Sequence, residues 1–142
     1  MLDSYRDLID DLLGTPKALR ELVGGRTASD LPPASLALIA GLRDRDRTVL
    51  GRLQAMMREP DALLSALSET APGPAPDDAA ALLDELDSAR GDLVSLLINL
   101  SLKDWARTAT HAVDGEIALA EEVERHVEFD EAQVEQIEAT LA

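Results

Sequence analysis

The fold is decided by a stretch near the end of the chain that starts with Gly115-Glu116-Ile117-Ala118-Leu119 and closes with Phe129-Asp130-Glu131-Ala132-Gln133-Val134-Glu135-Gln136-Ile137. Apolar residues recur through it one or two helical turns apart, which is the spacing of a single helix face. They are Ala120, Val123, Val127, Val134, Ile137 and Leu141. This stripe predicts an amphipathic helix over residues 116–141 that buries one face.

Three earlier segments have the same periodicity, and we predict helices over residues 3–24, 34–58 and 77–100. Within the first, Gly14-Thr15-Pro16 predicts a kink or a short break, because proline lacks the N–H that a helix needs. Asp77 is expected to cap the third helix. Residues 61–68 are expected to form a helical turn or two.

The run Thr70-Ala71-Pro72-Gly73-Pro74-Ala75-Pro76 is too rich in proline to be helical. It is long enough to cross a bundle, so the second and third helices need not be antiparallel neighbours. The four amphipathic segments therefore predict an all-α four-helix bundle, with a long Pro-rich crossover between helices two and three and without a sheet. We expect a single domain over residues 1–142.

The composition excludes several classes of function. The chain has 28 acidic and 13 basic residues and a formal net charge of -15, so we expect no nucleic-acid partner. It has no cysteine, which excludes disulfides and thiolate metal ligands. No apolar run reaches the ~20 residues of a membrane-spanning helix, and the first residues lack the pattern of a signal peptide. We expect a cytoplasmic protein without membrane contact.

Three phrases, in this order and spacing, resemble the DinB/YfiT-like family of four-helix bundles. They are Leu38-Ile39-Ala40-Gly41-Leu42-Arg43-Asp44, then Leu102-Lys103-Asp104-Trp105-Ala106-Arg107-Thr108-Ala109-Thr110-His111, and finally the closing stretch quoted above. The resemblance covers nearly the whole chain. It implies the same bundle fold and a possible homodimer that pairs through helix faces. We also expect Trp105 to pack against the bundle, because its indole is the largest apolar surface in an aromatic-poor chain.

The resemblance also implies a metal site of three histidines, one on the second helix and two spaced by four on the last. In this sequence the three positions hold Gly41, Phe129 and Gln133. Glycine and phenylalanine offer no lone pair, and a carboxamide is a poor ligand for zinc or nickel. These are therefore interpreted as vestigial metal-site positions, and we expect no metal, no other cofactor and no catalytic residue.

Three functional hypotheses follow. The first is a bundle that has lost its metal and binds a small ligand or another protein. The second, which the resemblance implies, is a thiol-transferase-type enzyme whose divalent metal is held by an unusual set such as His126, Asp130 and Asp44. The third is a metal-independent pocket that uses Arg45 and His126 to hold a small anionic ligand. Thr48 shares a helix edge with Arg45 and is a further candidate for the lining of that pocket.

Two carboxylates, Asp46 and Asp130, fall on apolar stripes, where a charge needs a partner. Arg43 and Arg47 are near enough in sequence to pair with Asp46. Asp130 has no such neighbour, and we expect it at a partly exposed end of its stripe. The alternating charges of residues 43–47 are expected to form a solvated, self-paired surface.

Overall fold

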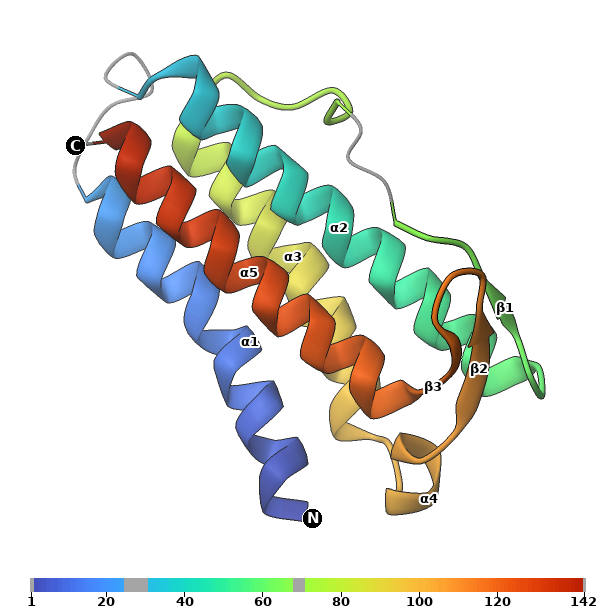
Figure 1. Ribbon diagram of the computed structural model, residues 1–142. Helices are drawn as coiled ribbons and strands as arrows, with labels where there is room; N and C mark the ends of the chain where they lie inside the picture. Colours follow the sequence, from blue (N-terminus) through green and yellow to red (C-terminus); the bar gives the residue numbers. More distant parts are fainter. Residues whose placement is uncertain (1, 25–30, 68–70, 142) are drawn as a thin grey trace.

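The computed structural model describes residues 2–24, 31–67 and 71–141. In chain order the elements are α1 (Leu2–Val23), α2 (Pro33–Arg58), β1 (Leu63–Leu64), α3 (Ala79–Ile98), α4 (Leu102–Trp105), β2 (Thr108–His111), β3 (Gly115–Ala118) and α5 (Leu119–Leu141). The predicted four-helix bundle is confirmed, with α1, α2, α3 and α5 as its long helices (Figure 1).

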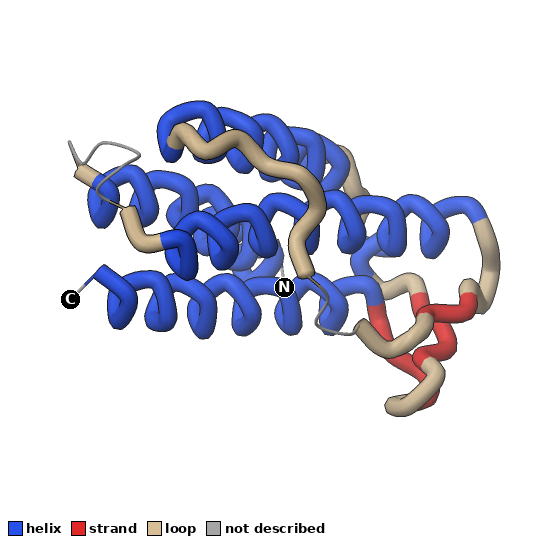
Figure 2. The backbone as a smooth tube through the Cα atoms, turned by 90° about the horizontal axis from the view of Figure 1, so that it is seen from above, coloured by secondary structure: helices blue, strands red, loops and turns tan. Residues whose placement is uncertain are grey.

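The helices form a ring in which α1 and α2 each pack on both α3 and α5. Helices α2 and α3 run in the same direction, and α1 and α5 run opposite to them (Figure 1). Neighbouring parallel helices need a connection that returns along the bundle. Residues 71–76 of the Pro-rich segment have no helix or strand, and Figure 2 shows this loop running along the helices. Thr70, the first residue of the predicted crossover, lies outside the described residues.

The helix ends differ in detail from the prediction. Asp78, not Asp77, caps α3, where its carboxylate accepts a hydrogen bond from the backbone N–H of Ala80. Helix α1 is continuous through Pro16, so the predicted break is wrong. The hydroxyl of Thr15 donates a hydrogen bond to Asp130 on α5. Packing of α1 on α3 and α5 therefore outweighs the hydrogen bond that Pro16 cannot donate.

The expectation of no sheet was wrong, because β1, β2 and β3 form a small sheet at one end of the bundle (Figure 2). Strand β2 pairs in parallel with β1 and antiparallel with β3. Residues 61–67 contain no helix, and Leu63–Leu64 form the strand β1, while residue 68 of the predicted turn lies outside the described residues. Helix α5 begins at Leu119 rather than at residue 116. Ala109 and Ile117 are buried while the adjacent Thr110 and Glu116 are exposed, which follows the two-residue period of strands.

The described residues contain two apolar clusters, one toward each end of the bundle. In every long helix a buried polar residue lies between a member of one cluster and a member of the other. The four are Thr15 between Leu12 and Leu19, Asp46 between Leu42 and Val49, Arg90 between Leu86 and Leu93, and Asp130 between Val127 and Ile137. A polar layer therefore divides the core.

Trp105 is buried, as expected, and its indole stacks on the ring of Tyr5 with centroids 4.5 Å apart. This stack fastens the short helix α4 to the start of α1. Among the described helices, none combines the length and the apolar character that crossing a membrane requires.

Candidate functional site

The polar layer is built around Arg90 of α3, whose guanidinium bridges two carboxylates. It donates to both oxygens of Asp46 on α2, at 2.8 and 2.9 Å, and to both oxygens of Asp130 on α5, at 2.6 and 2.9 Å. The same guanidinium donates to the carbonyl of Leu12 on α1 at 2.6 Å. One side chain therefore binds the other three long helices.

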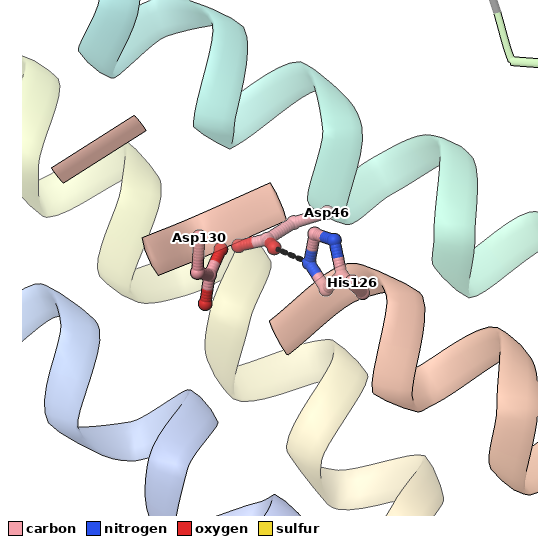
Figure 3. A group of neighbouring side chains, drawn as sticks. All are labelled: Asp46, His126 and Asp130. Carbon is pink, nitrogen blue, oxygen red and sulfur yellow. Dashed lines mark hydrogen bonds and ion pairs between the residues drawn. The ribbon is translucent and has the colours of Figure 1, made fainter. Parts of the chain in front are cut away.

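Two further side chains complete this network. Nε2 of His126 lies 2.6 Å from Oδ1 of Asp46, and the hydroxyl of Thr15 donates to Asp130 at 3.0 Å. Figure 3 shows Asp46 reaching from α2 toward His126 on α5, with Asp130 beside them. All five side chains of the network are buried.

The network keeps Arg90 charged. Burial on its own would lower the pKa of this guanidinium, but its hydrogen bonds to Asp130 and Asp46 outweigh burial and raise the pKa above its usual value. Because one guanidinium pairs with both carboxylates, loss of Arg90 would leave two buried carboxylates without their cation.

Asp46, His126 and Asp130 lie close enough to be considered as metal ligands, with ligand atoms within 4.8 Å of one another. One imidazole with two carboxylates is a chemically reasonable donor set for a divalent ion. However, Arg90 already donates to all four carboxylate oxygens. A metal ion there would meet a fixed positive charge at close range. With Arg90 in this position, the donor set does not fit a metal.

The three positions that the resemblance relates to a metal come together in space. Gly41, Phe129 and Gln133 line one cavity of about 480 Å³ between α2 and α5, here called the α2–α5 groove. Arg45 and Thr48 line it too, and the guanidinium carbon of Arg45 lies 4.0 Å from the centroid of the Phe129 ring. Of the three positions only Gln133 has a polar side chain, so the donors needed for a three-ligand site are absent from them.

A second cavity of about 340 Å³ adjoins the loop between β2 and β3, and we call it the hairpin cavity. Its charged and imidazole-bearing lining consists of Arg45, Arg52, Arg125, His111, His126, Asp114 and Glu122. Arg45 lines both cavities, whereas His126 lines this one and Thr48 lines the α2–α5 groove. The structure thus divides the three predicted pocket residues between two adjacent cavities.

Ion pairs hold most of the charged side chains of the hairpin cavity. Arg52 pairs with Glu122 and also donates to the carbonyl of Ser65 at 2.7 Å. Arg125 pairs with Asp114 at 2.8 Å. Two buried atoms of the lining, Oε2 of Glu122 and Nδ1 of His126, have no partner among the described residues.

His111 keeps the adjoining turn in place. Its Nδ1 accepts hydrogen bonds from the backbone N–H groups of Val113 and Asp114, at 3.1 and 3.2 Å. The ring thereby satisfies backbone donors of the loop between β2 and β3. Its role in the described contacts is to shape one wall of the hairpin cavity.

Several predictions about polar residues were wrong. Asp46 is paired by Arg90, not by Arg43 or Arg47, and Asp130 is buried rather than partly exposed. The alternating segment 43–47 is not wholly solvated, since Arg43 is buried against Glu85 of α3. Asp44, a proposed ligand beside His126 and Asp130, instead pairs with Arg43 and accepts from the N–H of Gly73.

Sequence reasoning missed Arg90, although its position carried a signal. It lies four residues after Leu86 and three before Leu93, on the leucine stripe of α3. A cation on one apolar stripe, together with two unpaired acids on other stripes, predicts that the three meet. The missing step was to pair charged residues on the apolar stripes of different helices, rather than charged residues within one helix.

The long helices, with α2 and α3 parallel and joined by a returning crossover, form a four-helix bundle of the YfiT type. A solved structure with this fold is that of YfiT from Bacillus subtilis, described as a probable metal-dependent hydrolase with an unusual four-helix bundle topology. It matches with a TM-score of 0.78 and 17% sequence identity, over 99% of this chain and 87% of that chain. At this identity the likeness shows the fold. No family model and no curated protein that we compared matches the sequence.

Proposed function

We propose that this protein is a metal-independent bundle that binds a small anionic ligand in the hairpin cavity. The observation that carries the proposal is that Arg45, His126, Arg52 and Arg125 all line one cavity. Guanidinium groups are well suited to carboxylates and phosphates, because their planar donors match the geometry of both.

The charge distribution supports this site. The chain as a whole carries a net charge of -15. In contrast, the hairpin cavity has three arginines against two acids, which leaves a formal charge of plus one with both histidines neutral. A local positive region on an acidic protein concentrates an anion where its contacts are made, and low-dielectric walls strengthen the attraction.

Two features support metal independence. The guanidinium of Arg90 provides the positive charge between Asp46 and Asp130. Gly41, Phe129 and Gln133 cannot supply three strong donors at the α2–α5 groove. The competing function is a metal-dependent enzyme, as YfiT is described to be. Among the described residues, the Asp46, His126 and Asp130 group favours it.

Metal analysis of protein purified without a histidine tag separates the two functions. We expect no stoichiometric zinc, nickel or iron, and no change in melting temperature on adding a chelator. About one equivalent of bound metal that disappears in His126→Ala would support the metal-dependent enzyme and contradict our proposal.

A thermal-shift screen against small carboxylates and phosphate tests the anion site itself. A ligand at 100 times its Kd stabilises the folded state by about 2.7 kcal/mol. We expect the shift to be lost in Arg45→Ala and retained in Arg47→Ala, because Arg47 is an exposed arginine of the same helix outside the cavity lining. Equal shifts in both variants would place the anion elsewhere.

We further propose that residues 1–142 form one domain. A third candidate function for the bundle is interaction with another protein. Sedimentation equilibrium measures whether the chain forms a homodimer. If a dimer forms and no anion binds, the interaction role is the better account.

A further inference from the structure

Two residues that line the hairpin cavity each have a buried polar atom without a hydrogen-bond partner in the described part of the chain. The atoms are Oε2 of Glu122 and Nδ1 of His126, and no described residue hydrogen-bonds to either. Both side chains are at least nine-tenths buried, with exposed fractions of 2% and 3% for the two residues. Buried polar atoms are nearly always paired in folded proteins, so an unpaired couple marks the place of a missing partner.

The two atoms belong to one location. Glu122 and His126 are four residues apart on α5, so their side chains lie one turn apart on the same face of the helix. Both residues line the hairpin cavity. The other polar atoms of these side chains are already used, Oε1 of Glu122 by Arg52 and Nε2 of His126 by Asp46.

The neighbours of these side chains prevent either from turning away. Asp46 is held by two hydrogen bonds from Arg90, so it fixes the imidazole that binds it. Arg52, which holds Glu122, is itself anchored to the carbonyl of Ser65. Oε2 and Nδ1 are therefore presented in fixed directions, which is the condition for selective recognition of a ligand group.

The chemistry of the two atoms limits what pairs with them. An ionised Oε2 only accepts a hydrogen bond, whereas Nδ1 accepts or donates according to the protons on the ring. A hydroxyl group has one hydrogen to donate and lone pairs that accept, so it can donate to Oε2 of the carboxylate and accept from Nδ1 where that nitrogen carries a proton. An ammonium group only donates and would bring positive charge toward Arg45, Arg52 and Arg125.

We infer that the ligand of the hairpin cavity is a small hydroxy acid, whose carboxylate lies against the arginines and whose hydroxyl donates to Oε2 of Glu122 and accepts from Nδ1–H of His126. This inference rests on the proposed anion site, which binds the carboxylate, and adds the hydroxyl group of the ligand. Both atoms are covered, so entry requires a lining side chain to move. Arg125 is the exposed arginine of the lining, so its side chain has the most freedom to move.

The test uses ligands that differ only in the hydroxyl. Titration calorimetry compares lactate with propionate, and malate with succinate, on the wild-type protein. We expect the hydroxy acid of each pair to bind at least tenfold more tightly, because without it two buried polar atoms stay unpaired. Binding of both members with equal affinity would overturn the inference and leave the anion site standing. Binding of none of the four acids would overturn the inference, and it would overturn the anion site as well if phosphate also gives no thermal shift.

A variant tests whether Glu122 is responsible for the preference for hydroxy acids. Glu122→Gln replaces one carboxylate oxygen by an amide, so the preference for the hydroxy acid should fall at least tenfold. Glu124→Gln makes the same change at an exposed position of α5 and should keep the wild-type preference. A preference that survives in Glu122→Gln would contradict the inference, as would tighter binding of alanine than of lactate.

A spectroscopic measurement covers the case in which Glu122→Gln fails to fold. The nitrogen-15 resonance of Nδ1 of His126 should move on adding malate and should stay in place on adding succinate at equal occupancy. A resonance that responds equally to both acids would show that the hydroxyl lies elsewhere, and the inference would be overturned.

Discussion

Arg90 and Asp46 form a buried ion pair with two hydrogen bonds, of 2.8 and 2.9 Å, that joins α3 to α2. These helices are parallel neighbours whose connecting segment returns along the bundle. The pair lies in the layer between the two apolar clusters, and Asp46 also fixes His126 beside the hairpin cavity. The same contact therefore links helix packing with the orientation of a cavity side chain.

The first prediction concerns the stability of this layer. Arg90→Met keeps much of the side-chain volume but leaves the carboxylates of Asp46 and Asp130 buried without their cation. Removal of one partner from a buried ion pair costs about 3–5 kcal/mol. We expect a loss of this size in the free energy of unfolding, measured by urea denaturation.

Arg20→Met is the matched control, since it removes an arginine that pairs with Asp84 and Asp87 at the surface. Exposed ion pairs contribute about 0–1 kcal/mol. Similar losses for Arg90→Met and Arg20→Met would show that the buried network is not the stabilising feature described here.

The second prediction is that Arg90 occupies a place that a metal ion could take. Arg90→Ala removes the guanidinium and leaves two carboxylates and Nε2 of His126 with ligand atoms within 4.8 Å of one another. We expect this variant to bind Mn²⁺ or Zn²⁺, and the metal to restore part of the lost stability, because an ion that binds only the folded state stabilises it.

Calorimetry of Arg90→Ala with and without His126→Ala measures this gain. The double variant should bind the metal more weakly, since it lacks the imidazole. If Arg90→Ala gains no affinity over the wild-type protein, the geometry of the three side chains is unsuited to a metal even without the guanidinium.

The sequence predicted the bundle well because its strongest signal is periodic. Apolar stripes at helical spacing gave the four long helices, and the prolines of residues 71–76 gave the crossover. It failed where structure depends on distant partners. Residues 108–111 and 115–118 form strands by pairing with one another, and β1 is added by pairing with β2. Such pairing leaves little trace in a single short segment.

The candidate site, like the fold, was predictable from the sequence only in part. The sequence predicted that Gly41, Phe129 and Gln133 meet, because their positions along two helices match the ligand positions of the resembled family. In the structure all three line the α2–α5 groove. The partner of Asp46 was not found, because Arg90 is 44 residues away along the chain. Likewise, the pairing of Glu122 with Arg52 depends on the angle at which α2 and α5 pack, which a helical wheel does not contain.

The third prediction uses two glycines in different backbone environments. Gly91 lies within α3, and a Cβ there would meet nothing within 4 Å. Gly91→Ala should therefore stabilise the protein by about 0.5–1 kcal/mol, since alanine loses less backbone entropy in a helix. Gly115→Ala has equal space but a φ of +75°, so it should destabilise the protein. Thermal denaturation measures both, and equal effects would contradict this account.

The last prediction tests whether the α2–α5 groove retains the geometry of a three-histidine site. Gly41, Phe129 and Gln133 line this groove together, and Phe129 and Gln133 are four residues apart on one face of α5. The triple variant Gly41→His, Phe129→His and Gln133→His should bind Zn²⁺ or Ni²⁺ with three imidazoles and an open position. The change at Gly41 should be tolerated, because a Cβ there would meet nothing within 4 Å.

Without metal the triple variant should be less stable than the wild-type protein, because Phe129→His removes the ring that lies against the guanidinium of Arg45. Metal should restore the loss by binding only the folded state. Arg45 also lines the groove, and its charge opposes a divalent ion, so Arg45→Ala added to the triple variant should raise the metal affinity. Calorimetry measures each step, with the double variant Phe129→His and Gln133→His as the two-imidazole control. If the quadruple variant binds no more tightly than that control, position 41 does not converge with the other two, and the interpretation of all three as vestigial ligand positions has to be abandoned.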